Sequence, residues 1–411
     1  MSTSGDFDCI VIGAGVQGSF TAYQLAKKNK KTLLLEQVRH EPSHFDQVSL
    51  CSTVTVLHYS LLIIDYKFIE CIENVTKEEI LKSLTSLLIS FFEDFFSRCR
   101  LKFPLISTFR QTGLLFMGPE KSENHQNIKD TLQTNKIPML VLTHDIFSQH
   151  IPNVNLAKGD GALVDTTAGV LFADRTLKAV QGQFQKLGGV IRDNEKVTDI
   201  KPGPVVRVST SVGVYHAKSL VITAGPWANK LLANTGLQLP LEVVKINVCY
   251  WKEKVPGSYS MEQRFPCFIQ TECLESKVDI YGLPSNEYPG LMKVCYHMGS
   301  KTDPDQRDLQ KDRSDIEILQ HYITRCFPGL IPEPAIVESC MYTLTPDHHF
   351  VLDYHPAYSN IVIGAGFSGH GFKFGPIIGK LLCELSLGEV PSYDLSPFHI
   401  RRFQSKTNSA L

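Results

Sequence analysis

The sequence carries almost no net charge and contains no long apolar run. Its 41 Lys and Arg residues against 42 Asp and Glu give a formal charge of −1, so neither nucleic acid nor an anionic membrane is expected as a partner. The apolar run over residues 84–92 is followed by Glu93 and Asp94 and is shorter than a membrane-spanning helix requires. No membrane segment is therefore predicted.

The cysteines also lack any arrangement that would indicate a metal site or a redox pair. Eleven of them are scattered without a CxxC motif, and the start of the chain does not resemble a signal peptide. We therefore expect a reducing compartment, mostly buried free thiols and no metal. With 43% hydrophobic and 20% charged residues, the 411-residue chain is typical of a globular protein of two or three domains.

The most informative pattern lies at the start, in residues 8–36. An apolar run ends at Gly13, which with Gly15 and Gly18 forms G-x-G-x-x-G, and a helical pattern and a second apolar run ending at Glu36 follow. A strand, a tight turn, a helix and a strand in this order are typical of dinucleotide binding, with the pyrophosphate at the helix N-terminus. The alternative is a glycine-rich turn without a ligand. An acid at the second strand end favours FAD or NAD over NADP.

The end of the chain repeats this logic. Residues 360–373 combine an apolar strand with a glycine-rich turn, and a helical pattern follows over 377–385. We expect this turn to reach the same cofactor, together with the turn that ends the apolar run over 219–223. The glycines of these two turns are Gly225, Gly364, Gly366 and Gly369.

Because cofactor-binding patterns occur at both ends, the dinucleotide domain is predicted to be discontinuous. Alternating residues over 240–300 predict antiparallel strands of a mixed sheet, so the fold class is α+β, with an α/β FAD domain and an inserted mixed-sheet substrate domain. The predicted FAD-binding parts are 1–109, 159–226 and 346–411, the last including the C-terminal tail, and the substrate parts are 110–158 and 227–345.

Several reactive residues stand in unusual contexts. Cys340 closes an apolar strand, although a buried structural thiol is the more common fate of a cysteine. Lys293 lies inside an apolar strand, where a lysine is costly to bury without a role. Lys373 follows the C-terminal glycine turn and could meet a ligand carboxylate, although a solvated lysine is the default. His297, Tyr342 and His370 could equally be packing residues.

Eight segments together carry a family resemblance. They are VIGAGVQGSFTAYQLAKKNKKTLLLEQ, RQTGLL, SLVITAGPW, INVCYW, YGLPSNEYPGLMKVCYH, ESCMYTLTPDHHFVLD, NIVIGAGFSGHGFKFGPIIGK and SYDLSPF. They resemble the monomeric sarcosine oxidase family, and more closely its vertebrate peroxisomal members. The resemblance covers residues 8–37 and about 110–403. It implies a glutathione-reductase-like FAD domain joined to a sheet-based substrate domain.

The resemblance also implies roles for individual residues. Cys340 matches the cysteine that bonds to the 8α-methyl group of FAD, Lys373 the lysine that binds the substrate carboxylate, and Lys293 the lysine that assists the reaction with O₂. Tyr342, His297 and His370 match other residues of the substrate pocket. The ADP-binding element is matched by Gly13, Gly15, Gly18 and Glu36, with Val197 as a backbone contact to adenine.

The implied reaction is the oxidation of a secondary amino acid, namely sarcosine, L-pipecolate or L-proline, to its imine, with O₂ reduced to H₂O₂. The family also implies a monomer. Three alternatives stay open: an inactive or flavin-deficient paralogue or isoform, a flavin dehydrogenase with another electron acceptor, and a NAD-dependent reductase, which Cys340 and the second glycine turn disfavour.

Residues 38–109 depart from the family pattern. The family has there a flavin loop rich in Ser, Gly and His that ends in closely spaced arginines, one of which pairs with the substrate carboxylate, whereas this segment has only Arg39, Arg98 and Arg100 in unrelated contexts. One hypothesis is an alternative product that has lost part of the site, and the other is divergence with a substitute; we favour the first. A core helix is predicted within the segment, over 78–99.

The C-terminus ends in Ser409, Ala410 and Leu411. Peroxisomal import favours a small residue, a basic residue and leucine, as in S-K-L, and two of these three positions fit. Together with the resemblance, this favours a peroxisomal protein that meets an import receptor, with a cytoplasmic protein as the alternative.

Overall fold

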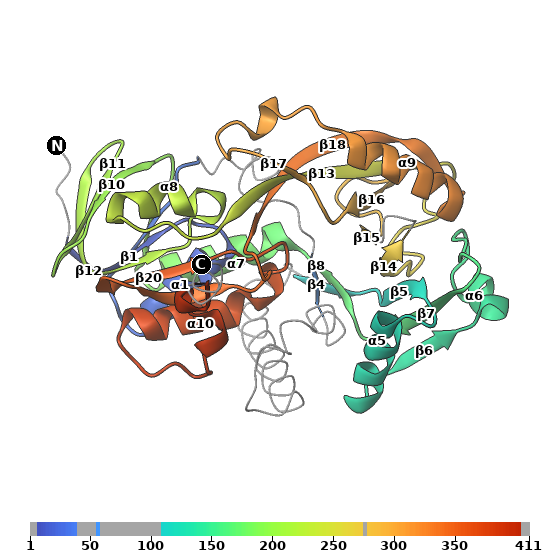
Figure 1. Ribbon diagram of the computed structural model, residues 1–411, viewed down its shortest axis with the longest axis horizontal. Helices are drawn as coiled ribbons and strands as arrows, with labels where there is room; N and C mark the ends of the chain where they lie inside the picture. The colour runs from blue at the N-terminus through green and yellow to red at the C-terminus, as the bar shows by residue number, and fades with distance from the viewer. Residues whose placement is uncertain (1–5, 39–54, 58–107, 274–277, 404–411) are drawn as a thin grey trace, which may run out of the picture.

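The chain folds around two large sheets that lie side by side. The computed structural model describes residues 6–38, 55–57, 108–273 and 278–403 (Figure 1). Residues 39–54 and 58–107, which include most of the atypical segment and the helix predicted over 78–99, lie outside the described residues. No helix in the described ranges is both long and apolar enough to cross a membrane.

The first sheet contains the opening strand at its centre. Its eight strands run in the order β10-β11-β12-β1-β2-β9, with β20 against β12 and β19 against β20. The contacts of β1 with β2 and β12, of β2 with β9 and of β12 with β20 are parallel. The strands are β1 (Asp6–Ile12), β2 (Thr32–Leu35), β9 (Val190–Arg192), β10 (Val197–Lys201), β11 (Val206–Thr210), β12 (Val214–Ile222), β19 (Val351–His355) and β20 (Tyr358–Ala365).

Helices cover both faces of this sheet, which gives the three layers expected of a doubly wound fold. On one face α1 (Val16–Lys27), α7 (Ala173–Lys186) and α10 (Gly375–Ser386) share an apolar core with the strands. On the other face, α8 (Ala228–Leu232) packs over the sheet, and Figure 1 shows the sheet between α8 and the α1/α10 pair. Both glycine-rich patterns therefore lead into helices of the same face.

The second sheet has nine strands in the order β17-β13-β16-β15-β14-β5-β7-β6, with β18 against β13. The pairing of β5 with β14 is parallel and the other pairings are antiparallel, so the predicted mixed sheet is confirmed. The strands are β5 (Leu114–Pro119), β6 (Met139–Leu142), β7 (Asp160–Asp165), β13 (Glu242–Glu253), β14 (Cys267–Cys273), β15 (Val278–Leu283), β16 (Leu291–Tyr296), β17 (Ser300–Lys301) and β18 (Leu330–Leu344).

The helices α5 (Glu123–Thr134), α6 (His144–His150) and α9 (Ser314–Cys326) accompany the second sheet. The buried side chains of α9 share an apolar core with β16. A small third sheet contains β3 (Thr55–Leu57), β4 (Phe109–Gln111) and β8 (Gly169–Leu171). Figure 1 shows β4 and β8 between the two large sheets.

The strand pairings depart from the predicted domain boundaries at two points. Strand β7 pairs with β5 and β6 in the second sheet, although 159–226 was assigned to the FAD-binding part. Conversely, Ala228, Leu232 and Leu239 are buried in the core of the first sheet, although 227–345 was assigned to the substrate part. Strand patterns do not identify their hydrogen-bonding partners, which is why these boundaries differ.

Candidate cofactor and substrate site

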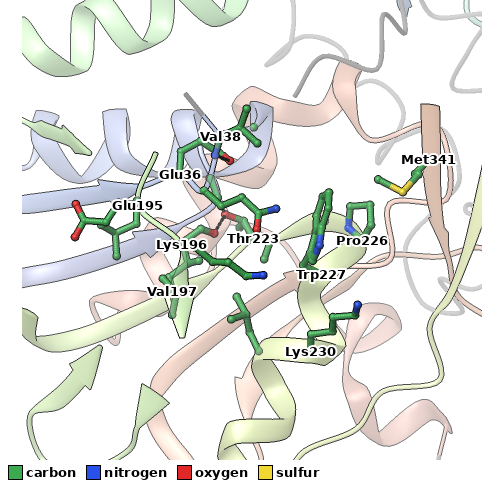
Figure 2. Close-up of a pocket in the computed structure, with 18 of the residues that line it drawn as sticks. Glu36, Val38, Glu195, Lys196, Val197, Thr223, Pro226, Trp227, Lys230 and Met341 are labelled. Carbon is green, nitrogen blue, oxygen red and sulfur yellow. Dashed lines mark hydrogen bonds between the residues drawn. The ribbon is translucent and has the colours of Figure 1, made fainter. Parts of the chain in front are cut away.

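A cavity of about 480 Å³ opens beside the carboxyl ends of β1 and β2 and extends to β18. In an open α/β sheet, ligands bind outside the carboxyl ends of the strands, and this volume is within the range of cofactor pockets. Figure 2 shows Glu36 and Val197 around the cavity, with Trp227 and Lys230 from the η1–α8 segment, where η1 is Gly225–Trp227. The predicted cofactor-binding residues that line it are Gly13, Gly15, Glu36, Val197, Gly225 and Cys340.

The glycine turn leaves room for a phosphate group at the start of α1. A Cβ atom on Gly15 would have no other atom within 4 Å, and no side chain caps this helix N-terminus. Gly13 has φ +98°, and a Cβ atom there would lie 2.4 Å from the carbonyl oxygen of Thr223, so the turn requires glycine. Unpartnered N–H groups and an open approach fit a pyrophosphate.

Gly18 has a different role from its two neighbours because it does not line the cavity. A Cβ atom on Gly18 would lie 1.9 Å from the carbonyl oxygen of Gly13 and 2.6 Å from Oγ1 of Thr223. Gly18 therefore allows α1 to pack against the turn, which is the role of the third glycine in this motif.

Glu36 holds the cavity wall together and has acceptor capacity to spare. Its carboxylate accepts hydrogen bonds from the backbone N–H groups of Ala14, at 2.9 Å, and of Val38, at 3.0 Å. A carboxylate has about four acceptor positions, so further donors such as ribose hydroxyls can be bound. The side chain is buried, which fixes its orientation.

A charged cluster beside the cavity, which includes the lining residues Trp227 and Lys230, was missed by sequence reasoning. Lys230 Nζ donates to Asp303 at 2.7 Å and to Asp305 at 2.6 Å, and the indole N–H of Trp227 donates to Asp305 at 2.7 Å. The hydrogen bond from Lys230 is the main cause that lowers the pKa of Asp305. The cluster connects α8 of the first sheet to the segment after β17 of the second. No local motif marks such a contact.

Cys340 lies at the far end of the cavity, on β18, opposite Ile246 of β13. Its side chain is buried, with 2% of its surface exposed. Its sulfur is disulfide-bonded in this structure. The geometry thus places Cys340 beside the predicted cofactor cavity.

Three aromatic rings gather next to Cys340 on the same sheet. The hydroxyl of Tyr342 lies 3.5 Å from that of Tyr281 and 3.5 Å from Nδ1 of His297. The ring centroids of His297 and Tyr342 are 5.4 Å apart. Burial raises the pKa of the Tyr342 hydroxyl, so it stays protonated and can donate a hydrogen bond at neutral pH. Sequence reasoning missed Tyr281, although its side chain points to the same face of β15 as that of Leu283.

The C-terminal glycine turn packs closely against this aromatic group. A Cβ atom on Gly369 would lie 2.7 Å from the ring of Tyr342, and one on Gly366 would lie 2.4 Å from Thr345. A Cβ atom on Gly364 would lie 2.8 Å from Leu382 of α10. These three glycines therefore serve close packing, and none of them lines the cavity itself.

His370 lies in the same turn, and Lys373 comes directly after it. Lys373 is buried, and its Nζ lies 5.2 Å from the ring centroid of Phe374. Nδ1 of His370 lies 3.2 Å from the carbonyl oxygen of Ser368, and its ring packs on Phe350 at 4.9 Å. Neither side chain lines the cavity. The prediction that Lys373 is more than a solvated lysine is supported by its burial.

Lys293, which lies inside an apolar strand, is buried, with 2% of its surface exposed. It lies on β16 opposite Tyr250 of β13, and its Nζ is 3.6 Å from Oε2 of Glu287. Its Nζ makes no hydrogen bond among the described residues. Glu287 and Tyr250 were missed by sequence reasoning: both lie in segments that carry the family resemblance, but neither residue was assigned a role there.

Comparisons with known proteins agree with this geometry. Residues 8–385 match the family described as FAD dependent oxidoreductase. "Peroxisomal sarcosine oxidase" of Homo sapiens is 45% identical over 402 residues, which cover 97% of each chain. "Monomeric sarcosine oxidase" of Bacillus sp. (strain B-0618) is 31% identical over 405 residues, again 97% of each.

The similarity extends to solved structures. The open form of NikD, described as an unusual amino acid oxidase essential for nikkomycin biosynthesis, has a TM-score of 0.78 at 20% identity and covers 96% of this chain and 98% of that one. Glycine oxidase from Geobacillus kaustophilus has a TM-score of 0.74 at 18% identity, with 97% and 99% covered. These similarities support the fold. The family match and the two long alignments show that this chain is a flavin amine oxidoreductase of the FAD-dependent oxidoreductase family, among the sarcosine oxidases.

Proposed function

We propose that this chain oxidises a secondary amino acid, namely sarcosine, L-pipecolate or L-proline, to its imine and passes the electrons to O₂ with formation of H₂O₂. The observation that carries the proposal is one continuous cavity from the open N-terminus of α1 to Cys340, beside the buried Tyr342. Relatives named sarcosine oxidase support sarcosine as the first substrate to test.

FAD, when bound, supplies the redox chemistry, and the chain supplies binding and orientation. Gly15 and the start of α1 would bind the pyrophosphate, and Glu36 would accept hydrogen bonds from the ribose hydroxyls. Lys373 is proposed as the anchor of the substrate carboxylate, which it binds as a point charge. The protonated hydroxyl of Tyr342 and the ring of His297 position the substrate beside the end of the cavity. Lys293 is proposed to supply positive charge where O₂ is reduced.

We further propose that Cys340 attaches the flavin covalently. The position of Cys340 at the end of the cavity supports this proposal. Attachment requires a free thiol, whereas the sulfur of Cys340 is disulfide-bonded in this structure. Intact-mass measurement separates the two states, since attachment adds one FAD to the chain. Cys340→Ser then removes the added mass, and an unchanged mass in the wild-type chain would contradict the attachment.

The first experiment is the absorbance spectrum of the purified protein before and after acid precipitation. Yellow colour in the pellet is the expected result and indicates covalent flavin. Colour in the supernatant would mean a bound but unattached flavin. A colourless protein would contradict the oxidase and favour the flavin-deficient isoform that the departure of residues 38–109 suggested.

Turnover with the three substrates then separates an oxidase from a dehydrogenase. H₂O₂ formed in proportion to O₂ consumed is expected. Turnover that requires an artificial electron acceptor would instead indicate the dehydrogenase. Sarcosine, L-pipecolate and L-proline are compared under the same conditions.

Localisation and assembly are also proposed. The peroxisomal names of the human and mouse relatives, together with Ser409 and Leu411, favour import into peroxisomes by a receptor that reads the C-terminus. A fluorescent fusion at the N-terminus should be punctate, and removal of the last three residues should make it diffuse. We also propose a monomer, which sedimentation equilibrium can test.

A further inference from the structure

Lys293 lies on the face of the second sheet that also bears Cys340. Strand β16 pairs with β13 so that Lys293 is opposite Tyr250, and β13 pairs with β18 so that Ile246 is opposite Cys340. Tyr250, Cys295, Cys340 and Tyr342 share one buried cluster, and Lys293 projects to the same side as Cys295 because residues two apart share a face. The lysine therefore stands in the wall that holds the proposed flavin attachment point.

A buried ammonium group at this position needs a compensating charge. Glu287, in the loop after β15, supplies it, with Oε2 at 3.6 Å from Nζ of Lys293. The distance is that of an ion pair without a direct hydrogen bond, and the Lys293 Nζ has no hydrogen-bond partner among the described residues. The N–H groups of the Lys293 ammonium can therefore donate to other groups, while the carboxylate of Glu287 balances its charge.

Glu287 is itself held in place. The hydroxyl of Tyr250 donates to Oε2 of Glu287 at 2.7 Å and lies 3.3 Å from Oε2 of Glu338. The hydroxyl of Tyr288 donates to Oε1 of Glu338 at 2.5 Å, and the Tyr250 and Tyr288 rings pack edge to face at 4.7 Å. Tyr250 also lies beneath the ammonium group, with its ring centroid 5.6 Å from Nζ. A network of two tyrosines and two carboxylates thus fixes the partner of Lys293.

We propose that Glu287 is a positioning residue for Lys293, held by Tyr250, and that it keeps this lysine oriented toward the site where O₂ reacts. The proposal rests on the proposed function, because it takes the role of Lys293 from there. Glu287 acts through Lys293 and has no contact with the reacting atoms. Its loss should therefore impair the reaction with O₂ and spare the reaction with the amino acid.

Stopped-flow measurements on the flavin-loaded full chain test this split. Glu287→Gln should slow reoxidation of the reduced enzyme by O₂ about tenfold, on the scale of a misplaced catalytic group. Anaerobic reduction by sarcosine should change by less than about twofold, within the effect of a distant substitution. Glu287→Asp should recover part of the loss. Equal losses in both half-reactions, or none in reoxidation, would overturn the proposal.

Glu242→Gln is the matched control. Glu242 lies on β13 of the same sheet and pairs with Lys301 at 3.0 Å, but both side chains are exposed. This variant should leave both half-reactions unchanged, because an exposed pair contributes little. A reoxidation defect equal to that of Glu287→Gln would overturn the proposal, because it would show a general effect of removing a carboxylate from the sheet.

A thermal unfolding cycle tests the pairing without requiring flavin or turnover. Glu287→Gln should lower the Tm of the chain that retains Lys293, because it leaves a buried charge without its partner. In the Lys293→Met background the same substitution should have little effect. Equal Tm shifts in both backgrounds would overturn the pairing. A chain without flavin, or normal reoxidation in Lys293→Met, would instead overturn the role of Lys293 in the proposed function.

Discussion

The glycines of the opening turn show how differently three residues of one motif act. Gly13 and Gly18 are required by protein atoms, since a Cβ atom at either position would overlap backbone of the neighbouring turn. Gly15 is required by nothing in the protein, because the space beside it is open. The spacing predicted all three residues, but only their surroundings separate packing from ligand approach.

This difference predicts opposite effects for two alanine substitutions. Gly18→Ala should lower the free energy of unfolding by about 1–3 kcal/mol, as overpacking does, even without flavin. Gly15→Ala should change it by less than about 0.5 kcal/mol but weaken FAD binding by roughly tenfold, because the backbone can no longer approach the pyrophosphate. Urea unfolding and flavin content measure the two effects. Equal behaviour of the two variants would contradict this assignment.

A second residue-scale prediction concerns Asp347, which pairs with Arg402 at 2.8 Å. Burial raises the pKa of Asp347, but the hydrogen bond and charge of Arg402 outweigh it, and the net pKa is lowered. A lowered folded-state pKa contributes stability above the unfolded pKa of about 4, which is lost as the pH falls through the folded value.

Asp347→Asn should therefore lower stability at pH 7 by about 1 kcal/mol, allowing for solvent screening of this partly exposed pair. The deficit relative to wild type should shrink as the pH falls below about 4. Tm against pH measures it, with Asp130→Asn, exposed on α5, as the control. A deficit that does not depend on pH would show that the ion pair is not its cause.

At the scale of elements, the first sheet depends on how closely α1 and α10 approach. A Cβ atom on Gly379 of α10 would lie 2.6 Å from the backbone carbonyl carbon of Phe20 in α1. Both helices follow glycine-rich turns, and Gln17 of α1 donates from Nε2 to the carbonyl oxygen of Gly371 at 2.7 Å. The helix contact thus couples the first and the last turn of the fold.

Gly379→Ala should separate these helices and cost about 1–3 kcal/mol, because the obstacle is backbone and cannot rotate away. Gly182→Ala on α7 is the matched control, since a Cβ atom there meets nothing within 4 Å. Alanine is the better helix former, so that variant should gain up to about 1 kcal/mol. Urea unfolding measures both. Destabilisation of similar size in the two variants would contradict the packing argument.

At the scale of the whole molecule, the cavity depends on two sheets being held side by side. The Lys230 cluster joins them, because α8 packs on the first sheet while Asp303 and Asp305 follow β17 of the second. These side chains are partly exposed, so their attraction is modest and screened by salt. The cluster therefore adjusts the contact between the sheets more than it creates it.

Lys230→Met should lower the Tm by about 1–2 °C at low ionic strength, and the difference should fade at about 1 M salt. Lys218→Met is the control, because Lys218 pairs with Asp8 within the first sheet and is mostly exposed. The control should show a smaller change. An equal or salt-independent loss in Lys230→Met would contradict an electrostatic contact between the sheets.

The amino-acid sequence by itself determined the elements whose signals are local. The glycine spacing, the apolar runs and Glu36 defined β1, α1 and β2, because turn conformation and periodicity depend on neighbouring residues. The helical pattern over 377–385 was predicted for the same reason and corresponds to α10. The apolar strand around Lys293 also marked this position as an unusual one for a lysine.

Only the tertiary structure decided which distant residues meet. It placed β7 in the second sheet, joined Lys230 to Asp303 and Asp305, and set Glu287 beside Lys293. It also showed that Gly364 and Gly369 serve packing and do not line the cavity. Strand pairing and ion pairing depend on chain segments brought together by folding, and no local pattern in this sequence specifies the partner.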